Sequence, residues 1–188
     1  SDGLPMLVAQ AKAAEEHFFE TPIPDCENER ILTQLRQECT NIVLIGMPGC
    51  GKSAVAEALG KALGRQVLDT DAYIEEHTGY TPEQIITMQG ESAFRTHGSE
   101  AVRELGSAFG AIVATGGGAV LRPENVRAMR QNGAVVFIDR ALEKLITTDD
   151  RPLSSSRTAL EKLYETRYDI YKNAADLHAD GNGTPDEV

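Results

Sequence analysis

The chain has 188 residues, a length that can bury one substantial hydrophobic core and would be generous for two. Its apolar share of 41% and charged share of 25% are ordinary for a soluble globular protein, and no apolar run approaches the ~18 residues that a membrane span requires. The net charge of -11 argues against a nucleic-acid surface, which needs clustered lysines and arginines. We therefore expect one main soluble domain that binds any anionic ligand through a few local cations.

The start of the chain and the cysteines indicate a compartment. Neither a secretory signal nor an arginine-rich transit segment opens the sequence, so we expect a cytoplasmic protein. Three cysteines, Cys26, Cys39 and Cys50, are an odd number without metal-ligand spacing, and Cys50 lies inside a glycine-rich loop. Reduced thiols fit this pattern better than a disulfide framework.

The first forty residues differ in pattern from the rest of the chain. Residues 4–19 place apolar side chains on one helical stripe, and the segment TPIPDCENE then breaks the pattern with two prolines. A second amphipathic stretch, NERILTQLRQE, predicts a short helix with Asn28 as its N-cap. We therefore divide this region into a helical segment at 1–20 and a linker with a short helix at 21–40.

From residue 41 onwards, strands and helices alternate. This alternation indicates βαβ units and a parallel sheet with helices on both faces, so the expected fold class is α/β, in the form of a three-layer sandwich. In such sheets, ligands bind beyond the carboxyl ends of the strands. The expected strands are 42–45, 67–69, 111–115 and 134–138, and the expected helices are 53–63, 71–78, 82–88, 91–107 and 123–132, with further helices beyond.

A glycine-rich segment, GMPGCGKSA at residues 46–54, directly follows the first predicted strand and matches the phosphate-loop pattern G-x-x-x-x-G-K-[ST]. Glycines let a phosphate reach the backbone N–H groups, which converge on the anion with the dipole of the next helix. Lys52 would reach the terminal phosphates of a nucleoside triphosphate, and the Ser53 hydroxyl would ligate Mg²⁺. The alternative, a turn that merely joins strand to helix, is disfavoured by the flanking elements. The candidate nucleotide-binding residues are Gly46, Met47, Pro48, Gly49, Cys50, Gly51, Lys52, Ser53 and Ala54.

Two carboxylates, Asp69 and Asp71, stand where the second predicted strand gives way to a helix. One is well placed to hold the water shell of a metal ion and the other to accept a hydroxyl proton. The alternative is that Asp71 only caps the helix that follows. Farther on, Arg95 lies near the start of a helix and the run TGGG ends a strand. Consecutive glycines there allow a ligand to lie against bare backbone, although turn flexibility alone would also explain them.

Taken together, these motifs resemble the shikimate kinase family. The segments GMPGCGKS, DTD, GESAFR, TGGG, DRPL and ETRYDIY occur in this order and at about the family's spacing, so the resemblance covers residues 41–188. It implies a P-loop kinase-type fold, usually monomeric. It also implies transfer of the γ-phosphoryl group of ATP to the 3-hydroxyl of shikimate with Mg²⁺ as cofactor, in the pathway to aromatic amino acids.

On the phosphate side, the resemblance assigns a role to each matching residue. Lys52 and Ser53 handle the phosphates and Mg²⁺, and Asp69 supports the metal. Asp71 binds and deprotonates the acceptor hydroxyl. Arg151, in the polar segment TTDDRPLSSS, resembles the lid arginine that reaches the transferring phosphate and excludes water.

On the acceptor side, the resemblance implies that Arg95 and Arg167 clamp the substrate carboxylate. Guanidinium forks match a planar carboxylate, so two arginines can hold an anion on an acidic protein. Arg167 could instead pair with Glu165 or Asp169 on a solvated helix, and its place in ETRYDIY favours the clamp. The backbone wall of the acceptor site would be Gly116, Gly117 and Gly118.

Three departures from the family pattern stand out. Gly98 occupies a position where the family commonly has a glutamate, so the support of Arg95 is in doubt. Lys144 stands in place of an additional arginine near the adenine. Near the end, the segment DGNGTPDEV lacks an arginine that some relatives set against the adenine. Thr184, Pro185 and Glu187 there also predict a capping box, and we expect the last helix to be truncated at Val188.

The opening segment DGLPMLVAQAKAAEEHFF resembles the closing helix of shikimate dehydrogenase, in which a glutamine at the position of Gln10 touches substrate. This resemblance implies a fused dehydrogenase and kinase, with Gln10 chemically idle here. An amphipathic helix that belongs to the kinase itself is the alternative. Two other functions also stay open: a gluconate-type or nucleotide kinase that shares the phosphate loop, and a catalytically weak pseudokinase module.

Overall fold

The structure is a computed structural model that describes residues 3–146 and 156–188. By its internal contacts, the chain divides into two compact units, Ser1–Thr40 and Asn41–Val188. Each unit is described by itself.

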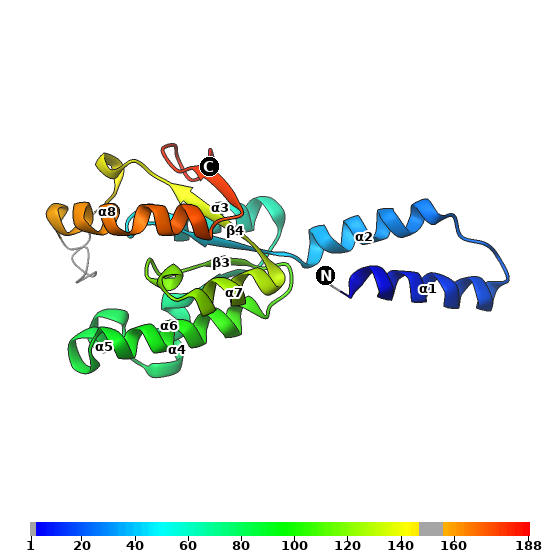
Figure 1. The fold of residues 1–188 in the computed structure, drawn as a ribbon, viewed down its shortest axis with the longest axis horizontal. Coiled ribbons are helices and arrows are strands. Elements are labelled where there is room, and N and C mark those ends of the chain that lie inside the picture. The colour runs from blue at the N-terminus through cyan, green and yellow to red at the C-terminus, as the bar shows by residue number, and fades with distance from the viewer. Residues whose placement is uncertain (1–2, 147–155) are drawn as a thin grey trace. The chain divides into compact units, whose positions relative to one another are not determined.

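The first unit is a pair of helices, α1 at Leu4–Phe19 and α2 at Asp25–Cys39, which lie side by side (Figure 1). Lys12 of α1 forms an ion pair with Asp25, and the backbone N–H of Ile23 donates to Glu16 at 2.8 Å. The prediction that Asn28 caps the second helix is wrong, because α2 begins three residues earlier with Pro24 at the cap position. Acidic residues in its first turn are stabilised there by the helix dipole.

The second unit is built on a parallel sheet. In the described part of the chain this sheet has five strands in the order β2-β3-β1-β4-β5, and all neighbouring strands are parallel. The strands are β1 at Asn41–Ile45, β2 at Val67–Asp69, β3 at Ile112–Ala114, β4 at Gly133–Asp139 and β5 at Leu177–Asp180.

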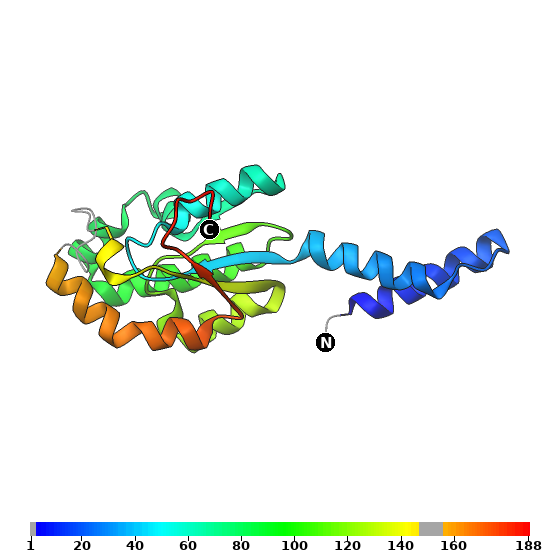
Figure 2. The ribbon, with the colours of Figure 1, turned by 90° about the horizontal axis from the view of Figure 1, so that it is seen from above.

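Helices cover both faces of this sheet. Figure 2 shows α3 on one face and α7 and α8 on the other, so the predicted α/β class with a three-layer arrangement is confirmed. No helix in the described ranges combines the length and apolar character that a membrane crossing would need. The helices are α3 at Lys52–Leu63, α4 at Thr70–Thr78, α5 at Pro82–Gln89, α6 at Glu91–Gly106, α7 at Pro123–Asn132 and α8 at Arg157–Ala174, with 3₁₀ turns η1 at Ala119–Leu121 and η2 at Leu142–Lys144.

The core lies on both sides of the central strand. Val43, Leu44 and Ile45 of β1 are at most 1% exposed, because a central parallel strand is covered on both faces and therefore needs a continuous apolar run. From α8, Leu160 and Tyr171 fill the same core. The carboxyl ends of β1, β2 and β3 consequently emerge together from a rigid base.

Beyond β4, the expectation of helices alone is wrong. The chain forms α8 and then the edge strand β5, whose first residue, Leu177, is 60% exposed. A residue just before β5 helps to place this strand beside β4, because the carboxylate of Asp176 accepts a hydrogen bond from the backbone N–H of Val135 at 2.9 Å. A short, polar edge strand lacks the apolar run that identifies buried strands in a sequence.

The predicted capping box near the end of the chain forms a turn instead of a helix start. The backbone N–H and the hydroxyl of Thr184 both donate to one carboxylate oxygen of Glu187, at 2.8 and 2.9 Å. The Thr184 hydroxyl is therefore a donor here, whereas an N-cap hydroxyl would accept from a backbone N–H.

Asn41, at the start of β1, is a buried polar residue that ties the sheet to the end of α6. Its side chain is 0% exposed and donates to the carbonyls of Gly106 at 3.2 Å and Ala108 at 2.7 Å. Its amide oxygen accepts from the backbone N–H of Ala111 at 2.8 Å. All three hydrogen bonds hold the loop that leads into β3.

We expect Asn41→Ala to lower the free energy of unfolding by about 3 kcal/mol, because it leaves a buried carbonyl and a buried N–H without partners. Urea denaturation at neutral pH measures this loss. The matched control is Asn132→Ala, which removes one 2.6 Å bond to the Ala108 carbonyl that Asn41 also satisfies. Equal losses in the two variants would contradict the role of Asn41.

Candidate functional site

The glycine-rich loop between β1 and α3 encloses the side chain of Lys52. This side chain is 6% exposed, and its Nζ donates to the carbonyls of Gly46 and Met47, each at 2.9 Å. Gly49 and Gly51 have φ angles of +76° and +91°, which residues with a Cβ rarely adopt. Gly51 is also the residue before the first turn of α3, so the loop leads directly into a helix N-terminus. This arrangement can receive phosphate oxygens on backbone N–H groups and place a cation beside them.

Next to the loop, the Ser53 hydroxyl donates to Asp69 Oδ2 at 2.9 Å. The other oxygen of Asp69 accepts from the backbone N–H groups of Asp71 at 2.8 Å and Ala72 at 3.4 Å. Asp69 is therefore the N-cap of α4, and the alternative that Asp71 merely caps this helix is wrong. Asp71 lies in the first turn of α4, and it lines the cavity described below.

The Ser53 and Asp69 pair has the donor atoms that Mg²⁺ prefers. A hydroxyl and a carboxylate oxygen lie within one hydrogen-bond length of each other beside the phosphate loop. Among the described residues there is no cluster of three or more His, Cys, Asp and Glu side chains that could enclose a metal ion. Mg²⁺ does not require one, since it is commonly held by one or two protein oxygens together with substrate phosphates.

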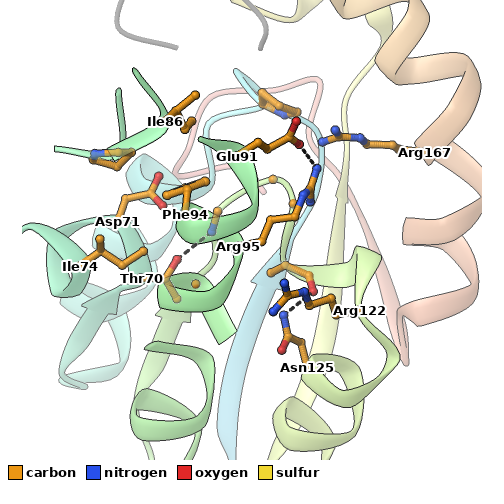
Figure 3. A pocket seen from close by; sticks show the side chains of 17 residues that line it. Thr70, Asp71, Ile74, Ile86, Glu91, Phe94, Arg95, Arg122, Asn125 and Arg167 are labelled. Atoms are coloured by element: carbon orange, nitrogen blue, oxygen red, sulfur yellow. Dashed lines mark hydrogen bonds and ion pairs between the residues drawn. The ribbon is translucent and has the colours of Figure 1, made fainter. Parts of the chain in front are cut away.

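Beyond the carboxyl ends of β1, β2 and β3 lies a cavity that gathers the other predicted site residues (Figure 3). Asp71 follows β2, Arg95 comes from α6, and Arg167 points in from α8 toward Glu91 and Arg95. Phe94 and Ile74 supply an apolar side of the wall. The predicted glycines also line this cavity, as Gly116, Gly117 and Gly118.

The three glycines are needed because other site groups lie directly against them. A Cβ on Gly116 would stand 2.9 Å from Asp71 Oδ1, and one on Gly118 would stand 2.9 Å from Arg95 Nη1. A Cβ on Gly117 would stand 2.9 Å from Cγ of Pro48 in the phosphate loop. Real Cβ contacts are longer than this, so any side chain here would displace a neighbour. This glycine bend, formed by Gly116, Gly117 and Gly118, therefore joins the cavity to the phosphate loop.

Arg95 has a carboxylate partner despite the glycine at position 98. Its guanidinium forms an ion pair with Glu91, one turn earlier on α6, and its side chain is 23% exposed. At Gly98, a Cβ would meet no atom within 4 Å. Glu91 thus supports Arg95, and the wall of the cavity at Gly98 is open.

Arg167 lies beside Tyr171, one helical turn later on α8. The Tyr171 hydroxyl donates to the Gly117 carbonyl, and burial raises the pKa of this phenol, while the nearby Arg167 and Arg95 cations lower it. Tyr171 thus links the helix of Arg167 to the run Gly116–Gly118. Within the described ranges, Arg167 makes no ion pair with Glu165 or Asp169, so the solvated-helix alternative is wrong.

Several residues in or beside the cavity were missed by sequence reasoning. Thr70 is 2% exposed, and its hydroxyl accepts from the Gly116 N–H at 2.8 Å, which connects α4 to the glycine bend. In the sequence, Thr70 was indicated only by its place inside the motif DTD. Tyr171 was visible in ETRYDIY but had no predicted contact. Arg122, four residues after the glycine run, carried no signal at all, yet it lines the cavity.

Two predicted features of the nucleotide side remain to be placed. Arg151, the expected lid arginine, lies outside the described residues. Lys144, which replaces the additional arginine of the family pattern, donates from Nζ to the Asn182 carbonyl at 3.0 Å and so contacts the turn after β5.

Comparison with known proteins agrees with this geometry. The family model described as Shikimate kinase matches residues 48–188. A shikimate kinase of Clostridium botulinum (strain Alaska E43 / Type E3) is 43% identical over 151 residues, which cover 78% of this chain and 91% of the relative.

Solved structures show the same relationship. The structure of shikimate kinase from Acinetobacter baumannii in complex with shikimate has a TM-score of 0.76 at 31% identity, covering 82% of this chain and 90% of the other. Shikimate kinase from Aquifex aeolicus has a TM-score of 0.69 at 31% identity, covering 79% and 90%. The chain therefore belongs to the shikimate kinase family.

Proposed function

We propose that this protein transfers the γ-phosphoryl group of ATP to the 3-hydroxyl of shikimate. The observation that carries this proposal is the single cavity in which Asp71, Arg95 and Arg167 meet the glycine bend, next to the phosphate loop. A small carboxylated polyol suits these groups, because the arginines match a carboxylate and Asp71 matches a hydroxyl. The A. baumannii relative, solved with shikimate, supports the choice of acceptor.

In the proposed reaction, the loop N–H groups and Lys52 hold the phosphates of ATP. The oxygen of the acceptor hydroxyl attacks the γ-phosphorus while Asp71 accepts the hydroxyl proton. The bond between the γ-phosphorus and the β-phosphate oxygen breaks, and ADP is released. Arg95 and Arg167 fix the acceptor carboxylate, so that the hydroxyl is presented in line. Mg²⁺ held by Ser53 and the water shell beside Asp69 would supply charge neutralisation at the phosphates.

A coupled assay of ADP release tests this function. We expect release to require ATP, shikimate and Mg²⁺ together. Release that depends on gluconate or on a nucleoside monophosphate would instead support one of the other P-loop kinases. ATP binding without turnover on any of these acceptors would support a pseudokinase module.

Asp71→Asn is expected to reduce kcat by about 10²–10⁴-fold, the usual contribution of a positioned general base, because the amide cannot accept the proton. The affinity for ATP, measured by titration calorimetry, should change little, since Asp71 lines the acceptor cavity. Asp186→Asn, at an exposed position, is the control and should keep wild-type rates. Wild-type turnover in the Asp71 variant would remove this residue from the mechanism.

Substitutions in the glycine bend allow an effect on Asp71 to be measured separately from an effect on Arg95. Gly116→Ala places a methyl group against Asp71, so we expect a lower kcat, whereas Gly118→Ala pushes on the end of Arg95, so we expect a higher KM for shikimate. Displacements of about 1 Å at reacting groups can cost up to about 100-fold. Steady-state kinetics with both substrates measures the two effects. The same change of kcat and KM in both variants would show that the glycines act only through the loop backbone.

We also propose that the helical segment at 1–20 derives from the closing helix of a shikimate dehydrogenase to which the kinase is fused, with 21–40 as the linker. Two facts support this: residues 4–19 form one helix, and Gln10 on it is exposed. Gln10→Ala should therefore leave kcat and KM for shikimate within about 2-fold of wild type, as expected for a surface change far from special features. A larger loss would favour the alternative that α1 is an integral part of the kinase.

A further inference from the structure

Arg122 is a cation of the acceptor cavity to which none of the roles above has been given. It follows η1, four residues after Gly118, and its side chain lines the same cavity as Arg95 and Arg167. Figure 3 shows Arg122 below Arg95, on the side of the cavity where Asn125 lies.

Hydrogen bonds hold Arg122 in this position. Its Nη1 donates to the Ser99 hydroxyl at 3.0 Å, and that hydroxyl donates to the Arg95 carbonyl at 3.0 Å. Asn125 is only 4% exposed. Its side chain donates to the Ala119 carbonyl at 2.9 Å and so fixes the turn that leads to Arg122. Arg122 is therefore tied both to the helix of Arg95 and to the glycine bend.

The charges around the cavity are unbalanced toward the positive. Of the described residues that line it, three are arginines and two are carboxylates, Asp71 and Glu91. Glu91 pairs with Arg95, whereas Arg122 has only the neutral Ser99 hydroxyl as a hydrogen-bond partner within the described ranges. A half-buried guanidinium without an acidic partner is unfavourable unless a ligand supplies the opposite charge.

Gly98 leaves space for that ligand next to Arg122. It precedes Ser99 on α6, and a Cβ there would meet no atom within 4 Å. A glycine inside a helix lowers helix stability, so this position gains nothing for the fold itself. Gly98 and Arg122 both line this cavity, so the free volume at Gly98 and the Arg122 cation belong to one binding space.

We propose that Arg122 binds the acid group of the acceptor together with Arg95, and that it thereby sets the preference of this protein for a carboxylated acceptor. This inference rests on the proposed function. Its distinctive consequence is that the Arg122 charge matters only for ligands that carry the carboxylate.

The test compares shikimate with its uncharged primary amide. KM for shikimate and the inhibition constant of the amide as a competitor are measured for wild type, Arg122→Gln and Arg122→Lys. Glutamine keeps a donor for the Ser99 hydroxyl but removes the charge, so we expect the preference for shikimate over the amide to fall about 10-fold, as for the loss of one charged contact. Lysine keeps the positive charge without the guanidinium fork, so it should retain more of the preference than glutamine does. KM for ATP should stay unchanged in both.

Arg127→Gln is the matched control. Arg127 is exposed on α7, the helix that follows Arg122, and its replacement changes the net charge equally, so the preference should remain at the wild-type value. A wild-type preference in Arg122→Gln overturns the proposal, as does equal weakening of shikimate and amide, which would indicate a merely structural role. An equal fall in the lysine variant also overturns it.

Failure of the proposed function is distinguishable from these outcomes. If wild-type protein does not phosphorylate shikimate, the proposed function fails before any variant is compared, and the role of Arg122 is withdrawn with it. If wild-type protein does phosphorylate shikimate and prefers it to the amide, only the variants decide about Arg122. Melting temperatures of all variants establish that each one is folded.

Discussion

The site depends on a backbone segment without side chains. Gly116, Gly117 and Gly118 leave β3 and pass so close to Asp71, Pro48 and Arg95 that a methyl group on any of them would fall 2.9 Å from its neighbour. Two hydroxyls hold this segment in place. The Thr70 hydroxyl accepts from its first N–H, and the Tyr171 hydroxyl donates to the carbonyl of its second residue. Because interiors transmit small displacements, this close packing couples the phosphate loop, Asp71 and Arg95.

Local charge outweighs net charge in this protein. The chain carries a net charge of -11, yet the described lining of the acceptor cavity has more arginines than carboxylates. Arg95 is partly neutralised by Glu91, and the cavity thus keeps cations whose natural partner is a ligand acid. Screening at physiological ionic strength acts over about 8 Å, so the distant acidic surface has little influence inside the cavity.

The sequence predicts the fold well where one physical signal is strong. The apolar run of β1 and the phosphate-loop pattern identified the central strand, the loop and α3, because buried parallel strands and phosphate cradles allow few residue types. Prediction failed at β5, where pairing with a neighbouring strand decides, and at Asn28, because α2 begins three residues earlier. β5 is ordered by pairing with β4, and α2 begins where Pro24 and the following acids place its first turn.

By itself, the sequence determined the α/β class, the phosphate loop and most of the residues now found around one cavity, since these follow from local pattern and motif order. Only the tertiary structure decided how those residues are partnered. The Thr70 and Tyr171 hydroxyls bind the glycine bend from α4 and α8, and Arg122 contacts Ser99 of α6 from a turn without any recognisable motif. Contacts between segments far apart in the chain arise from the packing of elements, and no local pattern records them.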